Sequence, residues 1–237
     1  MDRTYVICHM VTSMDGKILG PFLNEEAFEP YMEDYEVIHD GHDCGAWMVG
    51  RVSMEEHYTE GYQADLSQQA ITVTGREDFV APHDGPSYAI AIDSSGKLNW
   101  RENHISYESS TGFQKQHIIE VLAEKVSDVY LSYLREMGIS YIFGGQDALD
   151  FQLILQKLRH LFGIQRVLLE GGGMINGAFF KQGLIDEVSL LLAPVIDGSF
   201  QARTMVEAQD NWPVYFQLEK MEQRPEGGVW LQYKRKV

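Results

Sequence analysis

Residues 166–180 constrain the fold more than any other segment, because an apolar strand pattern there runs directly into three glycines and then into a helical pattern. Glycines at a strand-to-helix corner let backbone N–H groups approach a ligand, and the unpaired N–H groups at a helix start favour an anion. The spacing is not the G-x-G-x-x-G of a dinucleotide fingerprint. Gly171, Gly172 and Gly173 are therefore interpreted as a phosphate cradle or as a tight turn that needs glycine for its backbone alone.

Glu170 favours the functional interpretation of this corner. It stands at the end of the apolar run, immediately before the glycines. Burial of a carboxylate is costly unless partners compensate for it, so an acid in such a place indicates a functional site more often than not.

Composition limits the possible classes of protein. The 237 residues, 44% of them hydrophobic, suffice for one large α/β domain, which we expect to span residues 1–237. The 19 basic and 35 acidic residues give a net charge of −16, which argues against nucleic acid or an anionic membrane as the partner. With two cysteines, no signal-peptide pattern and no long apolar run, we expect a cytoplasmic protein.

The first half of the chain predicts strands separated by short helices. Strands are expected over residues 5–11, 46–49, 69–74 and 87–93, an acidic helix from Asn24 to about His39, and a short helix over 54–58 capped by Ser53. The polar turn of residues 12–17 follows the first strand, at the end of a parallel strand where ligands bind in open α/β sheets.

From residue 116 onward, strands and helices alternate with short connections, which predicts parallel crossovers and a sheet covered on both faces. Strands are expected over 118–122, 140–143 and 187–196, and a helix from its cap at Ser127 to Met137. A further helix has a core stripe at helical spacing, formed by Phe151, Ile154, Leu155, Leu158, Leu161 and Phe162. Residues 215–224 and 229–235 alternate around a Pro-Glu-Gly-Gly turn and predict a terminal antiparallel hairpin.

Four of the predicted strands end in polar or glycine residues: 12–17, 50–51, 144–145 and 170–173. The carboxyl ends of parallel strands lie at one edge of a sheet, so these segments are expected to outline a single cleft.

At this point a family resemblance becomes specific. The segments Val-Thr-Ser-Met-Asp-Gly-Lys-Ile (11–18), Val-Gly-Arg (49–51), Leu-Glu-Gly-Gly-Gly (169–173), Gly-Leu-Ile-Asp-Glu (183–187) and Ala-Pro-Val-Ile-Asp-Gly (193–198) occur in order along nearly the whole chain. Together they resemble the pyrimidine reductases of riboflavin biosynthesis.

The resemblance implies an α/β, three-layer, dihydrofolate-reductase-like fold with a mixed, mainly parallel central sheet and a C-terminal antiparallel hairpin. It also implies an NADPH-dependent reductase similar to 5-amino-6-(5-phosphoribosylamino)uracil reductase, which reduces the sugar of a phosphorylated pyrimidine amine to its open form. The cofactor residues that it implies are Thr12, Gly50, Arg51, Arg76, Gly145, Gly171, Gly172, Gly173, Met174 and Ile175. For Arg51, a surface salt bridge is the alternative.

Asp15 and Glu170 are the candidate catalytic residues. The hydride belongs to the cofactor, so the protein aligns the reactants and handles the proton that accompanies opening of the sugar. A buried acid beside a phosphate is expected to have a raised pKa, which suits a proton donor. Asp15 can alternatively close an Asx turn with Gly16.

Further observations affect substrate, partners and metal binding. Relatives often carry lysine at the position of His9, and the zinc-binding deaminase domain that many carry is absent, so the acceptor is less defined than the fold. The alternatives are reduction of dihydrofolate or another heterocycle, and a non-catalytic nucleotide-binding protein.

The apolar segment 187–196 and the family predict a homodimer. The His39-His42-Cys44 spacing matches no closed zinc pattern, so no metal is expected.

Overall fold

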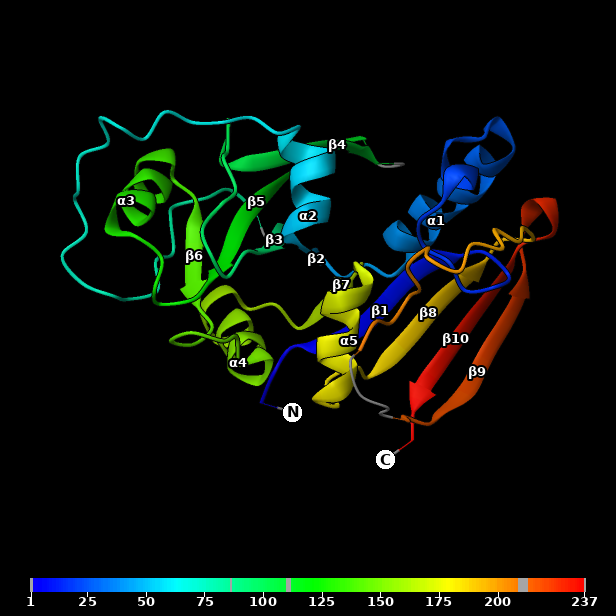
Figure 1. Cartoon of the computed structure of the whole chain (residues 1–237). Helices are drawn as coiled ribbons and strands as arrows, with labels where there is room; N and C mark the ends of the chain where they lie inside the picture. The colour runs from blue at the N-terminus through cyan, green and yellow to red at the C-terminus, as the bar shows by residue number, and fades with distance from the viewer. Residues whose placement is uncertain (1, 86, 110–111, 209–212, 237) are drawn as a thin grey trace. The chain divides into compact units, whose positions relative to one another are not determined.

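The computed structural model describes residues 2–85, 87–109, 112–208 and 213–236, which fold into two units (Figure 1). The first unit consists of Met1–Thr4 and Gly45–Gln165, and the second of Tyr5–Cys44 and Arg166–Val237. The chain thus enters the second unit early, forms most of the first unit as one long insertion, and returns to the second unit at Arg166.

The sheet of the first unit has the order β4-β5-β3-β2, from β4 (His104–Ser109), β5 (Gly112–Leu122), β3 (Tyr88–Ile92) and β2 (Ala46–Gly50). The pairs β2–β3 and β3–β5 are parallel, whereas β4 runs antiparallel to the first half of β5. The second half of β5 pairs in parallel with β6 (Ser140–Phe143). Strands β2, β3 and β6 are buried along their whole length, as expected of parallel strands covered on both faces.

The helices of the first unit have clear sequence signals at their ends. In α3 (Asp128–Met137), the Ser127 side chain accepts a hydrogen bond from Tyr130 N, and in α4 (Phe151–Phe162) the Asp150 side chain accepts one from Leu153 N. Gly138 and Gly163 end the two helices in the left-handed conformation. The short α2 (Arg51–Met54) follows β2 directly and continues into a π-helical turn, Glu55–Thr59.

The sheet of the second unit has the order β7-β1-β8-β10-β9, from β7 (Arg166–Leu169), β1 (Tyr5–Thr12), β8 (Glu187–Leu192), β10 (Val229–Arg235) and β9 (Phe216–Gln223). The first three strands are parallel to one another. Strand β10 is antiparallel to both β8 and β9, so the sheet ends in an antiparallel hairpin. The carboxyl ends of β1 and β7 therefore lie at the same end of this sheet.

Two helices cover the two faces of this second sheet. On one face, α1 (Glu29–Gly41) places the Tyr35 ring against His9 of β1. Successive residues of a strand point to opposite faces, so Met10 lies on the other face, where its side chain is next to Gly171, just before α5 (Gly173–Lys181). The second unit therefore has three layers, with the sheet between α1 and α5.

Several sequence predictions differ from the structure. Residues 69–74 form no strand; they are mostly exposed, and Thr72 N donates to the Ser132 hydroxyl instead of to a neighbouring strand. Helix α1 begins at Glu29, after two 3₁₀ turns, because Pro30 suits the first turn of a helix. Leu161 is 43% exposed and does not belong to the core stripe of α4. Strand β8 ends at Leu192, short of the predicted Ile196, and β4 was not predicted.

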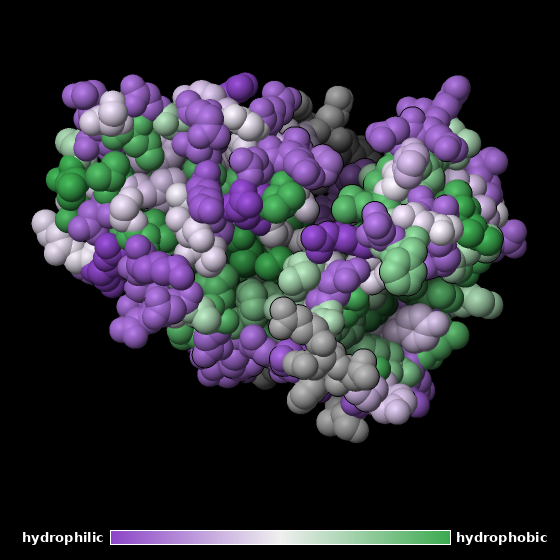
Figure 2. Space-filling view, viewed as in Figure 1, coloured by the Kyte–Doolittle hydropathy of each residue, from purple (hydrophilic) through white to green (hydrophobic). Residues whose placement is uncertain are grey.

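Hydrophilic and hydrophobic residues are interspersed on the face of the molecule in Figure 2. Within the described residues, none of the helices combines the length and the apolar character needed to cross a membrane.

Candidate active site

The corner between β7 and α5 is the central feature of the second unit. Gly171 has φ 91°, a conformation that side chains rarely adopt, and the Gly171–Gly172 peptide bond is cis. Gly172 is the N-cap of α5, and no side chain of the described residues caps this helix start. Among the described residues, a Cβ on Gly172 would meet no heavy atom within 4 Å, so they leave space beside the helix N-terminus. This is the arrangement expected of an anion cradle.

The third glycine of the corner has a different role. A Cβ on Gly173 would overlap the carbonyl oxygen of Thr204, because the segment 204–207 crosses the start of α5. Glu207 N donates to Gly173 O over 3.0 Å, and Asn176 Nδ2 donates to Met205 O over 2.9 Å. Gly173 is therefore required by packing. The two interpretations of the triple glycine therefore apply to different residues. Gly172 can face a ligand, whereas Gly173 is needed for packing.

Asn176 adds an unusual feature to this corner. Its side chain is fully buried, and its Oδ1 is the one buried side-chain nitrogen or oxygen within the described parts of the chain that has no hydrogen-bond partner. Its Nδ2 lies 3.8 Å from the position of a Cβ on Gly171. The side-chain amide of Asn176, whose oxygen has no partner, thus lies near Gly171.

Glu170 forms an ion pair with His39 of α1, with 2.8 Å between Oε1 and Nδ1. Both side chains are largely buried, with 11% of Glu170 and 15% of His39 exposed. Burial alone would raise the pKa of Glu170, but His39, together with a hydrogen bond from the Tyr35 side chain, lowers it below its usual value. The expectation of a raised pKa is therefore wrong for Glu170, because a cation compensates for its burial.

His39 is the partner that sequence reasoning missed. The sequence pattern indicates His39 only as a possible metal ligand, and 131 positions separate it from Glu170, so no local spacing could reveal the pair. Burial acts to lower the pKa of His39, but the carboxylates of Glu170, Glu36 and Asp40 outweigh it and raise this pKa to about 9. The ring is therefore an imidazolium at neutral pH.

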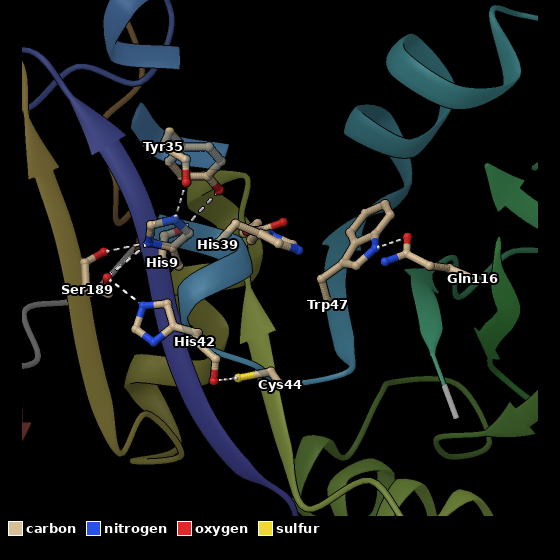
Figure 3. A network of polar contacts seen from close by, with 9 residues as sticks. His9, Tyr35, His39, His42, Cys44, Trp47, Gln116 and Ser189 are labelled. Atoms are coloured by element: carbon tan, nitrogen blue, oxygen red, sulfur yellow. Dashed lines mark hydrogen bonds and ion pairs between the residues drawn. The ribbon is translucent and has the colours of Figure 1, made fainter. Parts of the chain in front are cut away.

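Two further histidines, His9 and His42, belong to a buried polar network around Ser189 (Figure 3). The Ser189 hydroxyl accepts from Trp230 Nε1 at 2.9 Å and lies 3.0 Å from His42 Nε2 and 3.1 Å from His9 Nδ1. His9 Nε2 lies 3.3 Å from the carbonyl oxygen of Tyr35, which can only accept. The contacts with the Ser189 hydroxyl and the Tyr35 carbonyl are satisfied when His9 carries its proton on Nε2, the serine donates to His9 Nδ1, and His42 donates to the serine. His9 Nδ1 also lies 3.3 Å from the carbonyl oxygen of Ser189, to which only the other tautomer can donate.

Both histidines of the network are neutral. Burial lowers the pKa of His9, which is fully buried and stacked on the Tyr35 ring at 4.2 Å between centroids. Burial and the neighbouring His9 lower the pKa of His42 to about 4. His9 is thus a core residue that attaches α1 to β1. Among the described residues, no group of three or more His, Cys, Asp or Glu side chains is arranged to hold a metal ion.

Asp15 joins two loops of the second unit. Its carboxylate accepts hydrogen bonds from the Ser13 hydroxyl at 2.6 Å and from the backbone N–H groups of Asp197 and Gly198 at 3.1 and 3.0 Å. These bonds, the one from Ser13 first, lower the pKa of Asp15 to about 2. The expected raised pKa is wrong here as well, because Asp15 is exposed and surrounded by donors. Thr12, at the end of β1, is buried, with 3% of its surface exposed.

The other predicted cofactor residues lie in the first unit. Gly50 ends β2, and Arg51 forms an ion pair with Glu55 one turn further along. The Arg76 guanidinium contacts the carbonyl oxygens of Glu124 and Val126 and the Asp128 carboxylate, at the start of α3. The donors of Arg76 are thus already engaged in holding a helix start.

Gly145 has a structural reason to be glycine. It has φ 148°, and a Cβ there would overlap the carbonyl oxygen of Ala148. Of the four predicted strand ends, residues 12–17 and 170–173 belong to the second unit, and 50–51 and 144–145 to the first. A single cleft formed by all four remains a prediction.

Comparison with known proteins gives concordant matches. The model of the RibD C-terminal domain family matches residues 4–230. The 2,5-diamino-6-ribosylamino-4(3H)-pyrimidinone 5′-phosphate reductase of Methanothermobacter thermautotrophicus is 29% identical over 87% of this chain and 85% of its own length. The enzyme of the same name from Aquifex aeolicus is 32% identical over 87% of this chain and 84% of its own length.

A solved structure, the riboflavin biosynthesis reductase Rib7 of Saccharomyces cerevisiae, superposes with a TM-score of 0.59 at 15% identity, covering 100% of this chain and 91% of that one. The predicted α/β, dihydrofolate-reductase-like fold, with its mixed, mainly parallel sheet and C-terminal antiparallel strands, is thereby confirmed.

Proposed function

The chain belongs to the RibD C-terminal domain family, whose matched relatives are reductases, and we propose that it is an NADPH-dependent reductase of a ribosylaminopyrimidine 5′-phosphate. The observation that carries this proposal is the start of α5, which no described side chain caps and beside which the described residues leave space at Gly172, shortly after the buried Glu170. It offers an anion site and a charged side chain within one short segment. In this proposal, residues 1–237 act as one reductase domain.

The corner fits the pyrophosphate of a dinucleotide. The space beside Gly172, which a side chain would fill, lies at a helix start that no described side chain caps and can therefore admit an anionic ligand. Backbone N–H groups at Gly173 and Met174 would hold the pyrophosphate, with Ile175 in the first turn. When bound, the reduced nicotinamide supplies a hydride, and the protein supplies alignment.

The other cofactor residues are proposed with different weight. Thr12 ends a strand parallel to β7 and is proposed to line the nicotinamide end. Arg51 would have to exchange Glu55 for a cofactor phosphate, which a partly exposed ion pair permits at modest cost. Gly50 and Gly145 would bring backbone close to the cofactor. Arg76 is the weakest candidate, because its present contacts hold the start of α3.

The 2,5-diamino-pyrimidinone is proposed as the preferred acceptor, in place of the uracil expected from sequence. The support is that both relatives described above are named for the diamino compound. The two acceptors differ on the pyrimidine ring, so this preference concerns the ring and leaves the chemistry at the sugar unchanged.

A substrate panel tests the proposal. Oxidation of NADPH is followed with the diaminopyrimidinone phosphate, its uracil counterpart and dihydrofolate as separate acceptors. The diamino compound should give the highest kcat/KM. Turnover with dihydrofolate alone, or with none of the three despite NADPH binding, would refute this function.

Glu170 and Asp15 are proposed to act as anions. Glu170→Gln should lower kcat by about 100-fold, since it removes a preorganised charge. Asp15→Asn should chiefly raise KM, because it loosens the two loops that Asp15 joins. Wild-type turnover in both variants would exclude both residues from the site.

The protein is further proposed to be a homodimer. Leu218 and Met221 of β9 are 46% and 68% exposed, an apolar surface that a second copy could cover. Light scattering that gave the mass of one chain at micromolar concentration would refute this.

A further inference from the structure

We propose that His39 is a positioning residue of the site. It keeps the Glu170 carboxylate ionised and holds it in a fixed orientation toward the ribosylamino group of the substrate. The inference rests on the proposed function for the identity of the substrate. It concerns a pair that the sequence did not indicate, between the last turns of α1 and the end of β7.

The geometry of α1 places His39 where this role requires it. Tyr35 and His39 are four residues apart and so share one face of the helix. The Tyr35 ring stacks on His9 at an interplanar angle of 5°, and its carbonyl oxygen faces His9 Nε2 at 3.3 Å (Figure 3). The helix is thereby attached to β1 one turn before His39. The backbone of α1 that carries His39 is therefore held close to β1.

A second side chain of α1 also acts on Glu170. The Tyr35 hydroxyl, which lies 3.5 Å from the carbonyl oxygen of His9, helps to lower the pKa of Glu170. The 2.8 Å contact with His39 sets the orientation of the carboxylate, and the next residues are the glycines of the cradle. A charged group held in this way needs little reorganisation when charge develops beside it.

The surrounding charges keep the pair ionised. Glu36 and Asp40 of α1 and Glu170 of the β7 corner raise the pKa of His39, whereas His9 of β1 and His42 after α1 are neutral. Burial and the charge of Glu170 in turn raise the pKa of Glu36. Of the three described histidines in this cluster, His39 is the one that carries a charge at neutral pH. The proton is thus held on the imidazole, and Glu170 remains a carboxylate.

An anion suits the chemistry at the sugar. When the C1′–O4′ bond breaks, its electron pair stays on O4′, which takes a proton from water, and the nitrogen lone pair forms a C1′=N⁺ iminium. Hydride addition at C1′ returns the π electrons to nitrogen, so one hydride and one proton are consumed. A carboxylate beside the iminium stabilises its positive charge, whereas a protonated acid would not.

The pair itself can be tested without turnover. Imidazole NMR signals of the purified protein are titrated, and the His39 signal is assigned by its loss in His39→Gln. His39 should titrate near 9, and in Glu170→Gln its pKa should fall to its ordinary value or below, because burial is then unopposed. If wild-type His39 titrates at its ordinary value, the proposal is overturned even where the Glu170 variant fails to fold.

Kinetics test the positioning role. His39→Gln should lower kcat by roughly 100-fold while KM for NADPH changes by less than about twofold. The acidic limb of its pH profile should move to higher pH, because Glu170 loses its cation. His39→Lys, which restores a charge, should recover part of kcat. His160→Gln is the matched control, since His160 pairs with Asp2 but is 60% exposed.

The outcomes separate this inference from the proposed function. If the wild type turns over none of the pyrimidines, the function fails while the titration still decides the pair. If turnover is normal and His39→Gln keeps both kcat and the pH profile, the positioning role is wrong and the function stands.

Discussion

Gly177 of α5 lies so close to Glu207 that a Cβ on this glycine would overlap the Glu207 carbonyl oxygen. The segment 204–207 therefore requires glycine at this point of the helix, although alanine is the better helix former. Gly177→Ala should lower the free energy of unfolding by about 1–3 kcal/mol, as overpacking does. Urea unfolding followed by tryptophan fluorescence measures this.

Gly41→Ala is the control for that prediction. Gly41 is likewise a glycine in a helix of the second unit, the last residue of α1. A Cβ on Gly41 would meet no heavy atom of the described residues within 4 Å. Its free energy of unfolding should stay within about 0.5 kcal/mol of wild type. Equal effects of the two substitutions would show that segment 204–207 does not pack on α5 as described.

Gly172→Ala should separate binding from folding. Gly172 has φ −69°, and its Cβ would enter the open space before α5, so the free energy of unfolding should change by less than about 0.5 kcal/mol. The added methyl group would occupy space proposed for the pyrophosphate, and the Kd for NADPH should rise about tenfold, or about 1.4 kcal/mol. Fluorescence titration measures the Kd. An unchanged Kd in a stably folded variant would remove the cradle.

These glycines show which features of the corner a sequence pattern can predict and which it cannot. The strand–glycine–helix pattern predicted the corner and the start of α5 correctly, because those depend on local conformation. It did not distinguish Gly172 from Gly173, because the difference depends on the segment 204–207, about thirty positions away. Likewise, residues 69–74 have the composition of a strand but lie exposed without a partner strand, which no local pattern encodes.

The candidate acids illustrate the same limit for the site. Sequence reasoning identified Glu170 as a costly buried charge, and burial does act to raise its pKa. The sign of the net shift depends on His39, which reaches Glu170 only in the folded chain. For Asp15, the expected Asx turn with Gly16 did not indicate its main contacts, because its carboxylate accepts from the Ser13 hydroxyl and from the N–H groups of Asp197 and Gly198, about 180 positions away.

The His39–Glu170 pair should make stability depend on pH. The pKa of His39 rises from an ordinary 6.5 to about 9 on folding, so its contribution is fully present below 6.5 and is lost as pH rises through 9. The loss is on the order of 3 kcal/mol, at 1.36 kcal/mol per pKa unit. The pKa shift of Glu170 has the opposite sign. Its contribution to the free energy of unfolding is lost as the pH falls below the pKa that Glu170 has in the unfolded chain.

Urea unfolding at about pH 6 and about pH 9 measures this dependence. The free energy of unfolding of the wild type should fall more steeply between these values than that of His39→Gln, while His160→Gln should follow the wild type. Parallel pH dependence in wild type and His39→Gln would contradict an ionised pair.

Glu120 of β5, in the first unit, is an acid whose pKa is raised, in contrast to that of Glu170. It is fully buried, accepts from the Tyr130 hydroxyl at 2.7 Å and from Trp100 Nε1 at 2.9 Å, and burial and Asp93 raise its pKa well above the usual value. An acid with a raised folded pKa contributes stability below its unfolded pKa and loses it as pH rises.

Glu120→Gln removes this loss, but its amide nitrogen cannot accept from Trp100. The variant should therefore be less stable than wild type by about 1 kcal/mol near pH 5, and the difference should shrink or reverse toward pH 9. Thermal unfolding at the two pH values measures the change, and a difference that grows with pH would show that Glu120 is ionised in the folded protein.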